Sequence, residues 1–171
     1  MGRRVVIAPD SFKGSATSTE VARALADGWR AVHAGDEVVE LPLADGGEGT
    51  LEALAAARTD ARWSQAPVSG PDSRPVTARW LHLSDGTAVA ELAQSSGLPL
   101  MGHPDPLGAH TFGLGEVLAA ALDAGAQRII VGLGGSASTD GGAGCLTALG
   151  ARFPRSRRGA AGPRRRAARR P

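Results

Sequence analysis

Three segments of the sequence combine acidic side chains with clusters of glycine. They are "APDSFKGS" (8–15), "PLADGGEGT" (42–50) and "GLGGSASTDGGAG" (132–144), and the first contains Lys13, the only lysine of the 171 residues. Glycine-rich backbone binds anions through its N–H groups, carboxylates hold Mg²⁺ or orient an attacking hydroxyl, and a cation neutralises phosphoryl charge. The three segments therefore predict a site for ATP and Mg²⁺.

The third segment is not one of the common nucleotide-binding loops. No Gly-Lys-Ser/Thr follows its glycines, which excludes a P-loop, and its glycines are not spaced as GxGxxG. A glycine-rich turn of this kind also occurs for structural reasons alone. The prediction of ligand binding rests on finding three such segments, each with an acid, in one chain.

Each of the three segments follows a run that is typical of a buried strand. The runs are "RRVVIAP" (3–9), "EVVELPL" (37–43) and "QRIIVGL" (127–133), all rich in β-branched residues. Helical patterns follow them, beginning with "TSTE" from Thr17 to Glu20, which predicts a capping box and a helix over 18–33. Ligands of open α/β sheets bind at the carboxyl ends of the strands, where the three segments fall.

The first part of the chain alternates strand and helix, and the middle does not. An alanine-rich helix from Leu51 to about Arg58 completes a strand–helix–strand–helix order, which favours a parallel α/β sheet. Short alternating runs after residue 62 predict about three antiparallel strands, so we place a domain change there. The Gly- and Pro-rich stretch 95–111 is predicted as a loop, and a helical stripe begins at Gly113.

Composition excludes several other classes of protein. No apolar run approaches the length of a membrane span, and the N-terminus does not fit a signal peptide, so we expect a cytoplasmic protein. Cys145 is the only cysteine, which excludes a disulfide framework and a zinc cluster. The four histidines lack metal-ligand spacing, and the serines of the three segments have no partner histidine for a hydrolase triad.

Charge is distributed unevenly along the chain. Residues 1–153 hold eleven basic and seventeen acidic residues, a formal charge of −6, whereas residues 154–171 hold eight arginines and no acid. Such a tail, predicted to be disordered, is typical of non-specific nucleic-acid binding, which gives an alternative function. A reading-frame slip in a GC-rich gene is the other explanation, because Pro, Arg, Gly and Ala fill all but one of its positions.

Four blocks of the sequence resemble those of the bacterial type II glycerate kinases, in order and with ordinary spacing. They are "VVIAPDSFKGS", "PLADGGEGT", "DPLGAHTFGLGEVL" and "IIVGLGGSASTDGGAGCLTALGA". The resemblance covers residues 3–153 and implies ATP-dependent phosphorylation of D-glycerate, usually at the 2-hydroxyl, with Mg²⁺. It implies a two-lobed α/β fold with a cleft between the lobes: 1–62 as part of a parallel Rossmann-like lobe, and 63–153 as part of a mixed α/β lobe.

The same resemblance assigns site residues. Those matching the family's blocks are Asp10, Ser11 and Lys13 in the first segment, Asp45, Gly46, Gly47 and Glu48 in the second, and Gly134, Gly135, Ser136, Asp140, Gly141 and Gly142 in the third. Under this hypothesis Asp10 or Asp45 orients the glycerate hydroxyl and Lys13 neutralises phosphoryl charge. The loop 134–142 binds phosphate or the glycerate carboxylate, and the resemblance does not decide whether Asp10, Asp45 or Asp140 holds Mg²⁺.

Members of this family are about twice as long as the present chain. The match ends at Phe153, where further strands and active-site residues would follow. We therefore expect the chain to be a truncated form with little or no kinase activity. A metabolite-binding α/β module without catalysis is a third interpretation, which ATP-dependent product formation would separate from the first.

Overall fold

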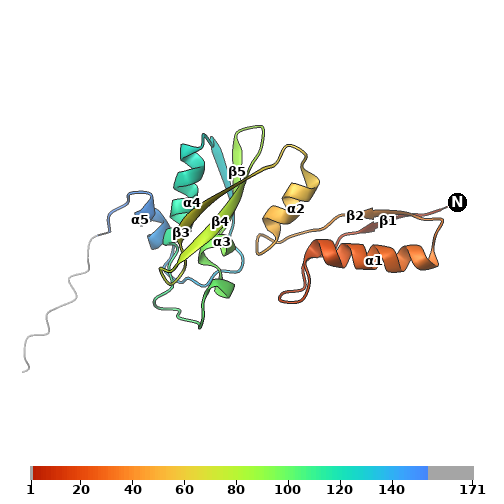
Figure 1. Cartoon of the computed structure of the whole chain (residues 1–171), viewed down its shortest axis with the longest axis horizontal. Helices are drawn as coiled ribbons and strands as arrows, with labels where there is room; N and C mark the ends of the chain where they lie inside the picture. The colour runs from red at the N-terminus through yellow and green to blue at the C-terminus, as the bar shows by residue number, and fades with distance from the viewer. Residues whose placement is uncertain (1, 154–171) are drawn as a thin grey trace, which may run out of the picture.

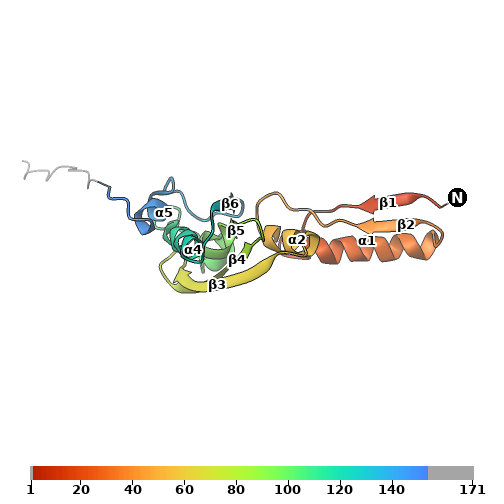
Figure 2. The ribbon, with the colours of Figure 1, turned by 90° about the horizontal axis from the view of Figure 1, so that it is seen from above.

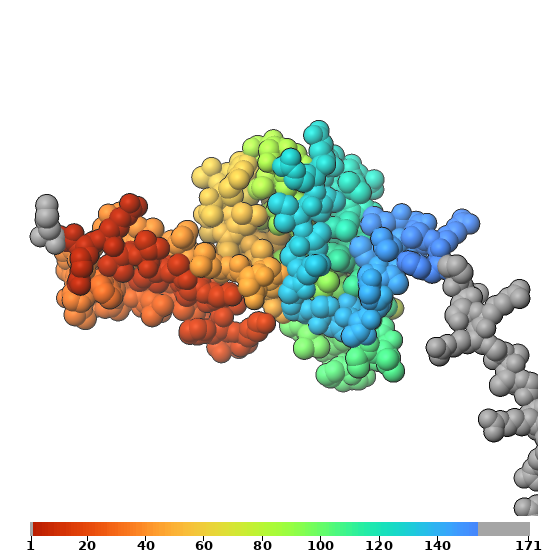
Figure 3. Space-filling model, turned by 180° about the vertical axis from the view of Figure 1, so that it is seen from behind, coloured from red at the N-terminus to blue at the C-terminus, as the bar shows by residue number. Residues whose placement is uncertain are grey.

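The computed structural model of this chain describes residues 2–153. The arginine-rich segment, with the disorder and nucleic-acid binding predicted for it, lies outside the described residues. The molecule is elongated, with a narrow N-terminal arm that extends from a thicker body (Figures 1, 2 and 3). In chain order its elements are β1 (Arg4–Ile7), α1 (Ser18–Val32), β2 (Glu37–Glu40), α2 (Thr50–Ala57), β3 (Arg62–Ser69), β4 (Pro75–His82), β5 (Thr87–Glu91), α3 (Ala93–Ser96), the 3₁₀ turn η1 (Leu98–Leu100), α4 (Phe112–Asp123), β6 (Arg128–Gly132) and α5 (Ala143–Ala148).

The N-terminal arm (residues 2–44) is a strand–helix–strand unit in which β1 and β2 pair in parallel. The predicted capping box is confirmed at the beginning of α1. The Thr17 hydroxyl accepts the N–H of Glu20, and the Glu20 carboxylate accepts the N–H of Thr17 at 2.8 Å. Helix α1 covers one face of the two strands, and its best-buried apolar residues are Val21, Ala22 and Ala26.

The body (residues 50–153) is built on a four-stranded sheet in the order β3-β4-β5-β6. Strands β3, β4 and β5 form the predicted antiparallel meander, and β6 pairs in parallel with β5. A parallel sheet and a mixed sheet in one chain confirm the predicted α/β class. In the part of the chain that the structure describes, no helix is long and apolar enough to cross a membrane.

Helices cover both faces of the four-stranded sheet, as Figure 2 shows from above. On one face α4 packs through Val117 and Ala121 against β3, β4 and β5. On the other face α2 packs through Leu51 against Leu81 and Val89. Every residue of β5 is buried as a result, because its alternate side chains enter the two opposite cores.

Two sequence predictions differ from the observed structure in detail. The stretch 95–111 was expected to be a loop throughout, but it begins with the end of α3 and then η1. An isolated bridge between Gly97 and Ser136 joins this stretch to the loop after β6. The domain boundary near residue 62 stays a prediction, and α2, which precedes it, packs on the sheet of the body.

Candidate active site

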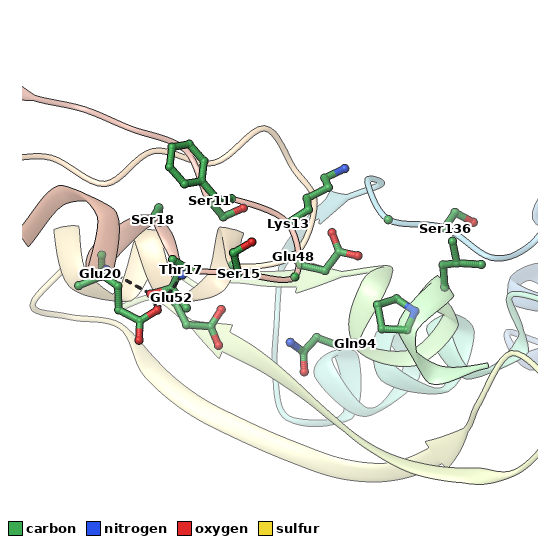
Figure 4. Close-up of a pocket in the computed structure, with 18 residues that line it drawn as sticks. Ser11, Lys13, Ser15, Thr17, Ser18, Glu20, Glu48, Glu52, Gln94 and Ser136 are labelled. Atoms are coloured by element: carbon green, nitrogen blue, oxygen red, sulfur yellow. Dashed lines mark hydrogen bonds between the residues drawn. The ribbon is translucent and has the colours of Figure 1, made fainter. Parts of the chain in front are cut away.

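A pocket of about 1000 Å³ lies between the N-terminal arm and the body (Figure 4). One wall is residues 11–20, which comprise the loop after β1 and the first turn of α1. The opposite wall is formed at the beginning of α2, around α3 and η1, and in the loop after β6. The loops that meet here follow β1, β2, β5 and β6, as expected for a ligand site at the carboxyl ends of strands.

The pocket brings together residues from all three predicted segments. Five of the predicted site residues line it: Ser11, Lys13, Glu48, Gly135 and Ser136. Eight do not: Asp10, Asp45, Gly46, Gly47, Gly134, Asp140, Gly141 and Gly142. Figure 4 shows the Glu48 side chain between those of Lys13 and Gln94, with Ser136 on the side of Glu48 that is away from α1.

Backbone hydrogen bonds hold the loop after β6 on both sides. The N–H of Gly134 donates to the carbonyl of Gly46 at 2.9 Å and so joins the second and third segments. The N–H of Leu98 donates to the carbonyl of Gly135, also at 2.9 Å. Ser136 follows directly, and its hydroxyl is hydrogen-bonded to the backbone and the hydroxyl of Ser138.

This contact between loops explains why two of the predicted site residues, Gly134 and Gly135, are glycines. A Cβ atom on Gly134 would lie 2.5 Å from the Cα of Gly47, where there is no room for it. Gly135 has φ +70°, and a Cβ there would meet the Glu48 carboxylate. Glycine is needed at both positions for the loops to approach, and anion binding by these N–H groups stays a prediction.

Lys13 and Glu48 are the pocket's oppositely charged residues that come from predicted segments. Among the described residues the Lys13 ammonium takes part in no ion pair, so its charge is available to an anionic ligand. Its side chain is exposed, whereas Glu48 is half-buried. A cation and a carboxylate on facing walls could bind a phosphoryl group and a hydroxyl side by side.

Asp10 and Asp45 are hydrogen-bonded within their own loops. Oδ1 of Asp10 accepts the N–H of Ser11 at 2.6 Å, and Oδ1 of Asp45 accepts the N–H of Gly47 at 2.9 Å. These bonds shape the turns after β1 and β2. Glu48 is consequently the acid of the second segment that lines the pocket, and the catalytic roles of Asp10 and Asp45 stay predictions.

Asp140 ties the third segment to the beginning of α4. Its Oδ2 accepts the N–H and the hydroxyl of Thr111 and the N–H of Gly144, each at 2.9 Å, and its Oδ1 accepts the N–H of Gly142 at 3.1 Å. Partial burial raises the pKa of Asp140, but the hydrogen bonds from Thr111, Gly144 and Gly142 outweigh it and hold the pKa below its ordinary value. Ionised Asp140 therefore fixes the path of this loop.

Sequence reasoning missed Glu52 and Gln94, which also line the pocket. The Glu52 carboxylate pairs with Arg79, whose guanidinium lies 4.4 Å from the ring centroid of Trp63. Gln94 follows β5 as closely as the predicted segments follow their strands, so the same rule would have included it. Glu52 carries no comparable signal, because an acid in the first turn of a helix is ordinary.

Which of Asp10, Asp45 and Asp140 holds Mg²⁺ stays a prediction. Within residues 2–153 no three His, Cys, Asp or Glu side chains lie close enough to form a metal cage. Each of Asp10, Asp45 and Asp140 is bonded to backbone N–H groups near it in the fold.

Comparison with known protein families shows the family to which the chain belongs. The model of the glycerate kinase family matches residues 5–167, almost the whole chain. The chain belongs to the glycerate kinase family. The pocket and its three segments lie within the matched residues.

Individual relatives agree with this assignment. A glycerate kinase of Bacillus subtilis is 48% identical over 153 residues, and a glycerate 2-kinase of Escherichia coli is 47% identical over the same number. Both matches cover 88% of this chain and 40% of the relative. A crystal structure of a putative glycerate kinase 2 from Salmonella typhimurium LT2 has a TM-score of 0.70 and 43% identity, covering 87% of this chain and 40% of the other.

The chain thus spans about 40% of the length of the glycerate kinases that it matches.

Proposed function

We propose that this chain acts in the ATP-dependent phosphorylation of D-glycerate, with 2-phosphoglycerate as the product. The observation that carries the proposal is the pocket, where Lys13, Glu48 and Ser136 come together from three separate glycine-rich loops. Membership of the glycerate kinase family supports the reaction class, and the similarity to a glycerate 2-kinase supports the 2-hydroxyl as acceptor.

We assign the residues of the pocket by their charge and position. The Lys13 ammonium neutralises negative charge on the phosphoryl group or on the glycerate carboxylate. The Glu48 carboxylate accepts a hydrogen bond from the glycerate hydroxyl and orients it. The hydroxyls of Ser11 and Ser136, on facing walls, hold the remaining oxygen atoms of the substrate.

The pocket fits ATP and Mg²⁺ by its size and by its oxygen donors. Mg²⁺ is held by one or two protein carboxylates together with phosphates and water, so a cage of three acids is not required. Glu48 and Glu52 on the wall at α2 are the carboxylates in position, and Oε2 of Glu52 is buried without a hydrogen-bond partner among the described residues. When bound, ATP supplies the transferable phosphoryl group and Mg²⁺ shields its charge.

A binding titration of the 171-residue chain tests the assignment. NMR spectra are recorded as D-glycerate or Mg–ATP is added, first to the original chain and then to Lys13→Ala. Because a charge-assisted hydrogen bond contributes about 1.5–3 kcal/mol, we expect Lys13→Ala to raise Kd by roughly tenfold or more. Arg23→Ala is the matched control, since it removes an exposed positive charge of α1 that does not line the pocket. Equal Kd values in all three proteins would contradict the assignment.

A second pair of variants compares the two acids of the loop after β2. Glu48→Gln is expected to weaken binding more than Asp45→Asn, because only Glu48 lines the pocket. If Asp45→Asn weakens binding more than Glu48→Gln, the hydroxyl-orienting role belongs to Asp45.

The reaction itself is followed by phosphorus NMR, which distinguishes 2-phosphoglycerate from 3-phosphoglycerate. From the chain alone we expect little or no turnover, because it spans only about 40% of its relatives. Rapid formation of phosphoglycerate would show that the described residues contain a complete catalytic site.

A further inference from the structure

A fully buried carboxylate lies beneath the pocket at the carboxyl end of β5. Glu91 is only 1% exposed, and it is the only Asp, Glu, Lys or Arg classed as buried among the described residues. Burial raises its pKa, and hydrogen bonds from the N–H of Leu51 and the side chain of Gln94 partly offset that rise. Burying a carboxylate costs free energy unless its oxygens are well hydrogen-bonded. The hydrogen-bond partners of Glu91 therefore indicate its role in the fold.

Both oxygens of Glu91 are bonded to elements of the pocket wall. Oε1 accepts the N–H of Leu51, in the first turn of α2, at 2.6 Å. Oε2 accepts a hydrogen bond from the side-chain amide of Gln94 at 3.3 Å. Gln94 itself lines the pocket, and Leu51 is flanked by Glu52 and by the Glu48–Gly49 turn.

The first bond replaces a helix cap that the local sequence does not provide. The N-cap of α2 is Gly49, at φ 92°, where a residue with a side chain would be strained and where no side chain caps the helix. Glu91 supplies the missing acceptor from forty residues further along the chain, and its negative charge suits a helix N-terminus. This bond joins the turn that carries Glu48 to the carboxyl end of β5.

We infer that Glu91 is a positioning residue of the pocket: its carboxylate sets where Glu48 and Gln94 stand on the wall that faces Lys13. The inference rests on the proposed function only for the identity of the ligand, since the contacts of Glu91 exist without one. Glu91 does not line the pocket, so it acts on a ligand only through the residues that it positions.

Glu116 provides a matched control within the same chain. Its carboxylate also accepts a distant backbone N–H at 2.6 Å, that of Ser69, but Glu116 does not line the pocket beside Lys13. Glu91→Ala and Glu116→Ala therefore each remove one acceptor of the same kind. Glu91→Gln keeps a carbonyl acceptor for Leu51 and removes the charge, and it serves as a second variant if Glu91→Ala does not fold.

The first measurement needs no ligand. In the 171-residue chain, Glu91→Ala is expected to speed amide hydrogen exchange at Leu51 by roughly tenfold and to move the side-chain NMR signals of Glu48 and Gln94. Glu91→Gln should move them less, and Glu116→Ala should speed exchange at Ser69 while leaving the Glu48 and Gln94 signals in place. Unmoved Glu48 and Gln94 signals in both Glu91 variants would overturn the inference, whatever the chain binds.

The second measurement is the titration with D-glycerate and Mg–ATP. Glu91→Ala should raise Kd by about fivefold to tenfold, Glu91→Gln by less, and Glu116→Ala not at all. An equal rise of Kd in Glu116→Ala would mean that Glu91 only contributes to the general stability of the fold, and it would overturn the inference. If the original chain binds neither ligand, the proposed function fails, and the ligand-free signals of Glu48 and Gln94 still decide the role of Glu91.

Discussion

In the N-terminal arm one helix covers one face of a two-stranded sheet, whereas in the body helices cover both faces of a four-stranded sheet. The difference is visible in burial. In the arm the side chains of Val6, Leu25 and Val32 are 55%, 53% and 76% exposed, whereas in the body every residue of β5 is buried. Similar strands and helices thus give a closed core only where a sheet is covered on both sides.

This contrast predicts two levels of stability in one chain. A two-stranded sheet is marginal by itself, and residues with few buried apolar contacts open at lower free energy than a closed core. The pocket lies between the two regions, so one wall belongs to the less stable arm and the other to the body. Ligand binding is expected to order the arm more than the body, because the arm has more order to gain.

The largest effect is expected from a cavity in the core of the body. Leu81 of β4 is fully buried against Leu51 of α2, and Leu81→Ala should lower the free energy of unfolding by about 3 kcal/mol. The matched change in the arm, Leu25→Ala, should cost less than about 1 kcal/mol because Leu25 is half exposed. Urea denaturation followed by circular dichroism measures both, and equal costs would mean that the arm is packed as tightly as the body.

An intermediate and pH-dependent effect is expected from Asp140. Its folded pKa lies below the unfolded value, so its stabilisation is fully present above the unfolded pKa and is lost as pH falls through the folded pKa. Asp140→Asn should therefore cost about 1–3 kcal/mol at pH 7, through weakened bonds to Thr111 and Gly144, and should flatten the acid limb of the stability curve.

Asp36 in the arm is the control for that experiment. Hydrogen bonds from Arg3 and Trp29 surround it, and the backbone bond from Arg3 lowers its pKa most. Asp36→Asn is expected to change hydrogen exchange in β1 and α1 and to leave the body unchanged. An equal change in the body would show that the two regions unfold as one unit.

The sequence predicted local features of both regions better than the contacts between distant segments. The capping box at Thr17, the meander after residue 62 and the three ligand segments each depend on neighbouring residues, and the structure confirms the first two. The packing of α2 on the body sheet was not predictable in this way. An apolar helix face bearing Leu51 has the same pattern whichever sheet it covers.

The candidate site shows the same limit. Lys13 and Glu48 were found because they lie in glycine-rich loops after strands. Asp10, Asp45 and Asp140 lie in the same loops. The Asp-Gly-Gly sequences at Asp45 and Asp140 are typical of Asx turns, in which the carboxylate accepts the N–H two residues on. The bonds from Thr111 to Asp140 could not be predicted in this way, because Thr111 is far along the chain. Glu91 could not be assigned from sequence, because its partner Leu51 is forty residues away.

The smallest effect is expected from a substitution in α1, and it tests most directly whether the arm and the body unfold separately. Gly28 lies in the middle of α1 with open space where a Cβ would be, so Gly28→Ala should stabilise the helix by about 1 kcal/mol. If the arm opens independently, hydrogen exchange should slow by roughly fivefold in α1 and not in β5. If the chain unfolds as one unit, the slowest amides of both regions should slow equally. Gly125→Ala is the opposing control, because its φ of +95° makes alanine unfavourable at the end of α4, and it should speed exchange in the body alone.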